Sequence, residues 1–83
     1  MIWWVYILEC NDGTLYTGTT NNLNKRIETH NKGNGAKYTR GRLPVILRVS
    51  FEFQNRSLAC KEEYRIKQLS RKEKQTLYER NGN

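Results

Sequence analysis

Four side chains between residues 6 and 30 are suited to chemistry on a phosphate or a similar anion. Tyr6 and Tyr16 carry phenol hydroxyls, and Arg26 carries a guanidinium that remains protonated in water. His30 is the only histidine of the chain. A guanidinium holds oxyanions through paired hydrogen bonds, and an imidazole exchanges protons near neutral pH. The set therefore suits proton transfer beside a bound anion, if the fold brings its members together.

Each of these residues also has an ordinary structural interpretation. Tyr6 and Tyr16 can be core aromatics whose hydroxyls reach the rim of the core. Arg26 can be a surface residue paired with Glu28. His30 can be a half-exposed residue favoured by the negative end of a helix. The residue types leave both interpretations open, so the elements that hold the residues matter.

The tyrosines lie on the two strands of a predicted β-hairpin. Residues 2–8 and 15–19 supply aromatic and β-branched side chains, and the turn sequence Asn-Asp-Gly lies between them at 11–13. A three-residue loop puts its glycine in the left-handed conformation and pairs Tyr6 with Gly18. In that register both tyrosines project from the same face of the sheet.

Arg26 and His30 lie four residues apart on a predicted helix, so they share one edge of it. Asn21 or Asn22 can cap the start of this helix, and Gly33 stands where its end would be capped. That edge can face the hairpin and bring both side chains to the tyrosines.

The rest of the chain predicts one more strand and two more helices. In chain order we expect a basic loop at 34–42, a strand at 45–53, a helix from Ser57 to about Leu69 and a helix from Ser70 towards Tyr78. Residues 80–83 are expected to fray. These elements predict an α/β fold in one domain of residues 1–83, with a small, mainly antiparallel three-stranded sheet flanked by helices.

The helix that follows the third strand carries two adjacent glutamates beside its apolar stripe. Glu62 projects into the middle of the stripe, and Glu63 lies at its edge. A carboxylate there is either a site residue or a side chain that reaches out to water. Periodicity does not choose between the two glutamates. The stripe itself is expected to consist of Leu58, Ala59, Ile66 and Leu69.

The charge of the chain indicates a polyanionic partner. Lys and Arg number 15 against 8 Asp and Glu, which gives a formal net charge of +7. Nucleic acid is the first candidate partner and an acidic membrane surface the second. No acidic residue occurs between Thr29 and Phe51, so Lys37, Arg40, Arg42 and Arg48 are expected to make one side strongly positive.

The remaining composition favours a cytoplasmic protein without a membrane segment. The apolar run at 2–8 is too short to span a bilayer. Cys10 and Cys60 lack the clustered spacing of a disulfide framework or a zinc site, so we expect two free, largely buried thiols.

Taken together, these motifs resemble the GIY-YIG nuclease superfamily, and within it the small stand-alone bacterial proteins. The likeness rests on the Asp-Gly turn, the LYTG strand, the capped helix ending in His30, a GAK-Y-TRG loop and an A-x-x-x-E-Y-x-x-K-x-L helix. It covers nearly the whole chain. The first family motif differs here, because Trp4 replaces its glycine and Val5 its isoleucine.

The resemblance implies two sets of functional residues. Its catalytic residues fall on Tyr6, Tyr16, Arg26, His30 and Glu63, with Glu63 as the metal ligand. The resemblance, and not periodicity, selects Glu63 over Glu62. The residues expected to bind nucleic acid are Lys37, Tyr38, Arg40, Arg42 and Lys67. In this basic loop Tyr38 is a candidate to stack on an unpaired base, and a simple packing role within the protein is the alternative.

Phosphodiester hydrolysis explains why the family would need these residue types. Arg26 would hold the non-bridging oxygens, Tyr16 would hydrogen-bond the phosphate or the water, and His30 would relay a proton. Tyr6 would act as a base only if nearby cations lowered its pKa. One carboxylate is a sparse ligand set, which suits a single Mg²⁺ or Mn²⁺ ion bound weakly without substrate.

The resemblance therefore implies a metal-dependent endonuclease, a phosphodiesterase acting on DNA, monomeric and serving DNA repair or recombination. Single-stranded or branched DNA is favoured over duplex, because one small loop cannot read base edges in a groove. RNA is also compatible. Two other classes stay open: a non-catalytic nucleic-acid-binding module with the same fold, and a protein-interaction domain whose charge serves solubility.

Overall fold

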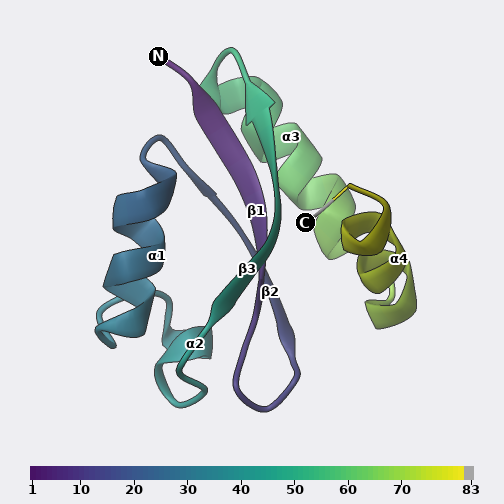
Figure 1. Cartoon of the computed structure of the whole chain (residues 1–83). Coiled ribbons are helices and arrows are strands. Elements are labelled where there is room, and N and C mark those ends of the chain that lie inside the picture. Colours follow the sequence, from purple (N-terminus) through teal and green to yellow (C-terminus); the bar gives the residue numbers. More distant parts are fainter. Residues whose placement is uncertain (82–83) are drawn as a thin grey trace.

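The computed structural model describes residues 1–81 and has the predicted α/β architecture. Its elements are β1 (Trp3–Glu9), β2 (Leu15–Thr20), α1 (Leu23–Asn31), α2 (Lys37–Arg40), β3 (Ile46–Phe53), α3 (Arg56–Lys67) and α4 (Arg71–Asn81). The three strands form one antiparallel sheet in the order β2-β1-β3. α1 and α2 lie on one side of the sheet, and α3 and α4 lie on the other (Figure 1).

The hairpin has the predicted register. Tyr6 pairs with Gly18 and Leu8 pairs with Tyr16, so both tyrosines lie on the face that α1 covers. Gly13 has a φ of 83°, the left-handed conformation that the three-residue loop requires. The turn sequence and strand periodicity were therefore sufficient to place the two tyrosines together.

The sheet separates two small apolar cores because successive strand residues point to opposite faces. The core beneath α3 and α4 consists of Val5, Ile7, Val49, Ala59 and Ile66. The core beneath α1 consists of Tyr6, Leu8, Cys10 and Val45, with Leu23 and Ile27 of α1 packed against it. Tyr6 is thus a core residue as well as a candidate site residue.

Several predicted boundaries were wrong. The segment expected to be a loop contains α2, and α3 begins earlier because Asn55, not Ser57, accepts a hydrogen bond from the Leu58 amide at 2.9 Å. With α3 in this position, Leu58 is 42% exposed and outside the stripe. Cys60 is also exposed, although Cys10 is buried as expected.

The two C-terminal helices are connected by a cap that was correctly predicted. Ser70 Oγ accepts a hydrogen bond from the Glu73 amide at 3.1 Å, and Glu73 Oε1 accepts from the Ser70 amide at 2.9 Å. This reciprocal capping box starts α4. Arg80 and Asn81 belong to α4, contrary to the expected fraying, and the same expectation for residues 82–83 lies outside the described residues. Over residues 1–81, no helix is long and apolar enough to cross a membrane.

Candidate active site

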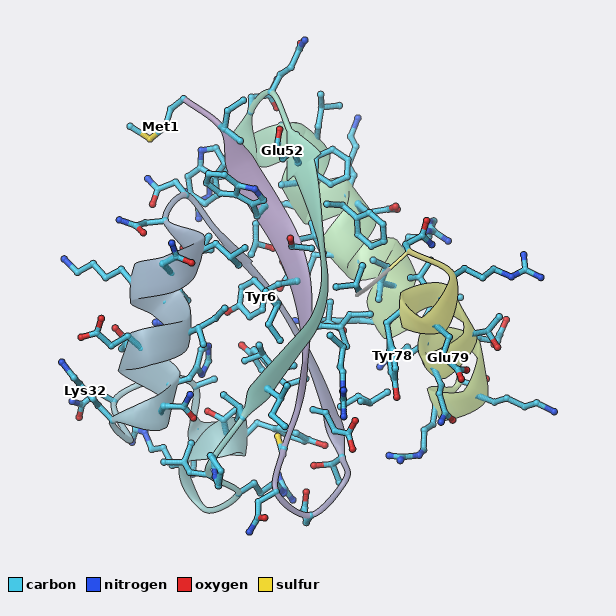
Figure 2. The ribbon with its side chains drawn as sticks, viewed as in Figure 1. Met1, Tyr6, Lys32, Glu52, Tyr78 and Glu79 are labelled. Atoms are coloured by element: carbon cyan, nitrogen blue, oxygen red, sulfur yellow. The ribbon has the colours of Figure 1, made fainter. Side chains whose placement is uncertain are left out.

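A chain of buried hydrogen bonds connects β1, α1 and α2. The Tyr6 hydroxyl lies 3.0 Å from His30 Nε2, and His30 Nδ1 lies 3.0 Å from Thr39 Oγ1. Tyr6 is 1% exposed, and His30 and Thr39 are fully buried. Figure 2 shows the Tyr6 ring extending from β1 towards α1. The half-exposed histidine that the sequence allowed is therefore excluded.

Thr39 determines the tautomer of His30. The Thr39 hydroxyl donates its only hydrogen to the Ala36 carbonyl oxygen at 2.9 Å, so it can only accept from His30 Nδ1–H. His30 Nε2 then carries a lone pair and accepts the hydrogen bond from Tyr6. The direction of the chain is thus Tyr6 to His30 to Thr39, with the imidazole as the proton acceptor nearest the phenol.

Two glycines leave room for this chain. A Cβ atom at Gly18 would lie 2.4 Å from the Tyr6 hydroxyl oxygen, and one at Gly35 would lie 2.3 Å from His30 Nδ1. Both distances are far below van der Waals contact. The Tyr6 ring can therefore lie across β2, and the loop before α2 can pass against the imidazole, only because these positions lack side chains.

Aromatic rings extend the site from His30 to the surface. The ring centroids of Tyr16 and His30 are 5.4 Å apart, and those of Tyr16 and Tyr38 are 5.8 Å apart. The Arg42 guanidinium lies 4.2 Å from the Tyr38 ring centroid. Tyr38 is 42% exposed, so the predicted base-stacking residue already packs between Tyr16 and Arg42, with part of its surface open.

Burial holds the Tyr6 phenol in its protonated form. Burial raises the pKa of Tyr6 to about 12, and the charges of Tyr16 and Glu63 add to this rise while the nearby Arg26 guanidinium opposes it. Tyr6 would act as a base by itself only if cations lowered its pKa below 10.0, and Arg26 alone does not achieve this. Desolvation of the phenolate outweighs the favourable charge of Arg26.

Burial also favours the uncharged form of His30. Burial, together with the positive charge of Arg26, lowers the pKa of His30 from 6.5 to about 4. The Tyr6 and His30 pair is therefore uncharged at neutral pH, with the hydrogen bond running from phenol to imidazole. Arg26 acts electrostatically on both partners, so the four residues of the first prediction meet in one place.

Glu63 joins this group from the opposite helix layer. Its negative charge contributes to the raised pKa of Tyr6, and its carboxylate pairs with Lys67 at 3.1 Å. Glu62 pairs instead with Arg65, and the Arg65 guanidinium lowers the pKa of Glu62. The two glutamates that periodicity could not distinguish thus have different partners, and the charge of Glu63 is the smallest of the influences on the Tyr6 pKa.

The donor set suits a weakly held divalent ion. Among residues 1–81 there is no group of three or more His, Cys, Asp or Glu side chains that could form a metal cage. Glu63 alone is a ligand of the kind that Mg²⁺ takes when most of its other ligands are waters and substrate phosphate oxygens. Lys67, expected to bind nucleic acid, is engaged with this carboxylate.

Several of the other basic residues expected to face nucleic acid already contact groups within the protein. Arg40 Nε donates to the Gly35 carbonyl oxygen at 3.3 Å, and Lys37 is exposed. Arg42 pairs with Asp12 at 3.0 Å, and Arg48 pairs with Glu9 at 2.8 Å. The long acid-free segment is therefore less positive than expected, because acids from the hairpin fold back onto it.

Sequence reasoning missed the importance of Thr39, Gly18 and Gly35. All three stand within motifs that carry the family resemblance, the LYTG strand and the GAK-Y-TRG loop. The predicted pairing of Tyr6 with Gly18 was a usable signal for that glycine, since a tyrosine opposite a glycine can lie across it. No sequence signal placed Thr39 or Gly35 against His30, because both contacts depend on how α2 packs on α1.

Comparison with known proteins supports the fold and identifies relatives of the chain. A model of the GIY-YIG catalytic domain matches residues 2–77. A UPF0213 protein of Halobacterium salinarum is 55% identical over 74 residues, which cover 89% of this chain and 96% of that relative. A UPF0213 protein of Clostridium perfringens is 60% identical over 75 residues, which cover 89% of this chain and 80% of the relative. The solution NMR structure of a UPF0213 protein from Bacillus halodurans matches with a TM-score of 0.65 at 46% identity, covering 100% of this chain and 88% of that one.

Proposed function

The chain belongs to the GIY-YIG family, and on that premise we propose that it is a metal-dependent endonuclease that hydrolyses phosphodiester bonds in DNA. The observation that carries this proposal is the buried chain from Tyr6 through His30 to Thr39 beside Arg26. A neutral imidazole, oriented by one partner and bonded to a phenol by the other, is arranged to receive a proton.

The proton route follows from the direction of the hydrogen bonds. The attacking water gives its proton to the Tyr6 oxygen while the Tyr6 hydroxyl proton moves to His30 Nε2. His30 then carries the positive charge, and Nδ1–H stays bonded to Thr39. Tyr6 never has to exist as a free phenolate, which accords with its raised pKa.

Substrate binding makes His30 a stronger base. The positive charge of Arg26 is one of the two causes that lower the His30 pKa. Arg26 also lines a groove of about 220 Å³ at the start of α1, together with Lys25. A phosphodiester that binds Arg26 from this groove offsets its charge, so the pKa of His30 rises when substrate is in place.

Glu63 is the residue that would hold the divalent ion. When bound, Mg²⁺ or Mn²⁺ neutralises the charge that develops on the phosphoryl oxygens and stabilises the leaving oxygen. Lys67 competes for the same carboxylate. Metal binding is therefore weak until the substrate phosphate adds its own oxygens.

We assign single-stranded or branched DNA as the substrate, with a role in DNA repair or recombination. The net charge of +7 supports a polyanion. The exposed part of Tyr38 beside the site offers a surface for an unpaired base. α2 is a single short helix, which is too small to read base edges in the major groove of a duplex.

A cleavage assay with matched variants tests the proposal. A labelled panel of single-stranded, duplex and branched DNA and of RNA is incubated with Mg²⁺ or Mn²⁺. Glu63→Gln and Arg26→Ala are expected to lose cleavage by about 10²-fold or more. The controls Glu62→Gln and Arg80→Ala change the same residue types outside the proposed site and are expected to keep cleavage. If the control variants lose as much activity as the test variants, the assigned roles are wrong.

One observation favours a second function, a nucleic-acid-binding module without turnover. The only carboxylate assigned to the metal is already paired with Lys67. This function predicts salt-dependent binding that persists in Glu63→Gln and Arg26→Ala. Binding by all the variants with no cleavage of any substrate would replace the nuclease by this module.

A further inference from the structure

A second cationic groove lies beside the aromatic end of the candidate site. It has a volume of about 250 Å³ and is lined by Thr14, Leu15, Tyr38, Arg71 and Lys74. It therefore brings together the hairpin, α2 and the first turn of α4. Neither Arg71 nor Lys74 belongs to the residues assigned to the candidate active site.

The groove is connected to the site through a series of aromatic contacts. Tyr38 lines the groove and packs on Tyr16, and Tyr16 packs on His30. A polynucleotide strand held at Arg26 can thus continue past Tyr16 and reach the groove within a few nucleotides. In this series of contacts the groove lies at the Tyr38 end, and Arg26 acts on Tyr6 and His30 at the other end.

The charges of the groove favour an anion. Among the residues of 1–81 that line it, two are cationic and none is acidic. The nearby Asp12 is engaged, because Thr14 donates to Oδ1 and Arg42 pairs with Oδ2. The larger groove along α4 differs, since its lining includes Glu73 together with Lys72 and Arg80.

Arg71 is held in position by the hairpin. Its Nη1 donates to the Gly13 carbonyl oxygen, and its other N–H groups make no further hydrogen bond within residues 1–81. Lys74 is half-buried one turn further along α4. A guanidinium that is already ordered loses less conformational entropy when it binds a phosphate.

We propose that Arg71 and Lys74 bind a backbone phosphate of the same DNA strand, a few nucleotides from the scissile phosphodiester. Tyr38 then contacts the sugar or base that lies between the two phosphates. This inference rests on the proposed nuclease function and extends it, because it gives the strand a path across the β2 edge of the sheet. The Arg71–Gly13 bond makes α4 part of that path.

Salt-dependent binding tests the groove apart from catalysis. Fluorescence anisotropy of a labelled single-stranded DNA is measured in EDTA, so that no cleavage occurs, over a range of salt concentrations. For Arg71→Gln/Lys74→Gln, the slope of log affinity against log salt is expected to fall by about 0.7 for each phosphate that the protein no longer neutralises. The double variant Lys72→Gln/Arg80→Gln removes the same charge from α4 and is expected to keep the wild-type slope.

The outcomes separate the two proposals. If the wild-type protein binds and both double variants have its slope, the groove is not a phosphate site, and the proposed function stands. If the wild-type protein binds no DNA, the proposed function and the groove fail together. Lys74→Gln alone keeps the Arg71–Gly13 bond, so it measures half of the site even if loss of Arg71 destabilises the hairpin. An unchanged slope in this folded variant removes Lys74 from the site.

Discussion

His30 is surrounded by groups that fix both its charge and its tautomer. Thr39 accepts from Nδ1–H, Tyr6 donates to Nε2, and burial together with the charge of Arg26 disfavours the imidazolium. A histidine in this setting is ready to accept a proton without rotating or exchanging tautomers. The two predictions that follow concern the hydroxyl that orients the ring and the pH at which the ring becomes charged.

Thr39→Val keeps the side-chain shape and removes the acceptor for His30 Nδ1–H. The buried N–H loses its partner, which is expected to lower the free energy of unfolding by about 1 to 3 kcal/mol. Cleavage is expected to fall at least about tenfold, because the tautomer that accepts from Tyr6 is no longer favoured. NMR of the imidazole nitrogens reports the tautomer directly.

Thr29→Val is the control for this change. The Thr29 hydroxyl only donates to the Lys25 carbonyl oxygen within α1, at 2.8 Å. This variant is expected to keep the His30 tautomer. A wild-type tautomer ratio in Thr39→Val would show that Thr39 does not orient the ring.

The lowered His30 pKa makes folding sensitive to mild acid. Between about pH 6.5 and about pH 4 the unfolded chain binds a proton at His30 that the folded chain does not bind. The free energy of unfolding therefore falls as the pH falls through this window, by about 1 to 3 kcal/mol. Urea unfolding at several pH values measures the effect.

His30→Gln cannot take up a proton and serves as the comparison. Its unfolding free energy is expected to vary less between pH 6.5 and pH 4 than that of the wild-type protein. Carboxyl groups whose pKa is lowered by folding, such as Asp12 and Glu28, lose their stabilising effect mainly at lower pH. Parallel curves for the two proteins over the window would contradict the low pKa of His30.

The elements differ in how they serve the site. β1 and β2 place the tyrosines through their register, α1 supplies the arginine and histidine from one edge, and α2 closes the site with Thr39. α3 lies on the other face and still influences Tyr6 through Glu63. Gly18 of β2 leaves room for the side chain of Tyr6, which comes from the neighbouring strand β1.

Gly18→Ala is expected to displace the Tyr6 ring. The new Cβ would lie 2.4 Å from the Tyr6 hydroxyl oxygen and 2.5 Å from the carbon that bears it. The strain is expected to cost about 1 to 3 kcal/mol of stability and to break the bond to His30. Cleavage and thermal unfolding are measured together.

Gly41→Ala provides the matched control, because nothing lies within 4 Å of the Cβ that it adds. It is expected to have nearly wild-type stability and activity. Equal activity in Gly18→Ala and the wild-type protein would mean that the position of the Tyr6 hydroxyl is not critical for cleavage.

Apolar side chains hold the described part of the chain together. Its two apolar cores lie on opposite faces of one three-stranded sheet, and the described residues provide no metal cage that folding would need. The net charge of +7 lies on the scaffold that these two cores hold together.

Removal of divalent metal is therefore expected to abolish cleavage while leaving the fold intact. EDTA should stop hydrolysis of DNA because the charge on the phosphoryl oxygens is no longer neutralised. The circular dichroism spectrum and the melting temperature should stay the same to within about 1–2 °C, since a weakly bound ion adds little stability at low occupancy. A large fall in melting temperature on chelation would reveal a structural metal instead.

Local patterns in the sequence were enough to predict most of the scaffold. The Asn-Asp-Gly turn and the alternation of the strands determined the pairing of Tyr6 with Gly18. Ser70 correctly indicated where α4 begins, and Asn22 is one of the two caps predicted for α1. Such features depend on residues close together in the chain, whose geometry is nearly independent of the rest. The start of α3 was wrong because Asn55 and Ser57 are both good caps, and only packing selects one.

The contacts that define the site belong to the tertiary structure. The bond of Thr39 to His30, the pairing of Lys67 with Glu63 and the path from Tyr38 to Arg71 depend on where separate elements meet. The pKa of Tyr6 follows the same rule: the sequence shows a cation that can lower it, but the depth of burial raises it. Desolvation depends on everything that surrounds a side chain, so its balance against charge appears only when the chain is folded.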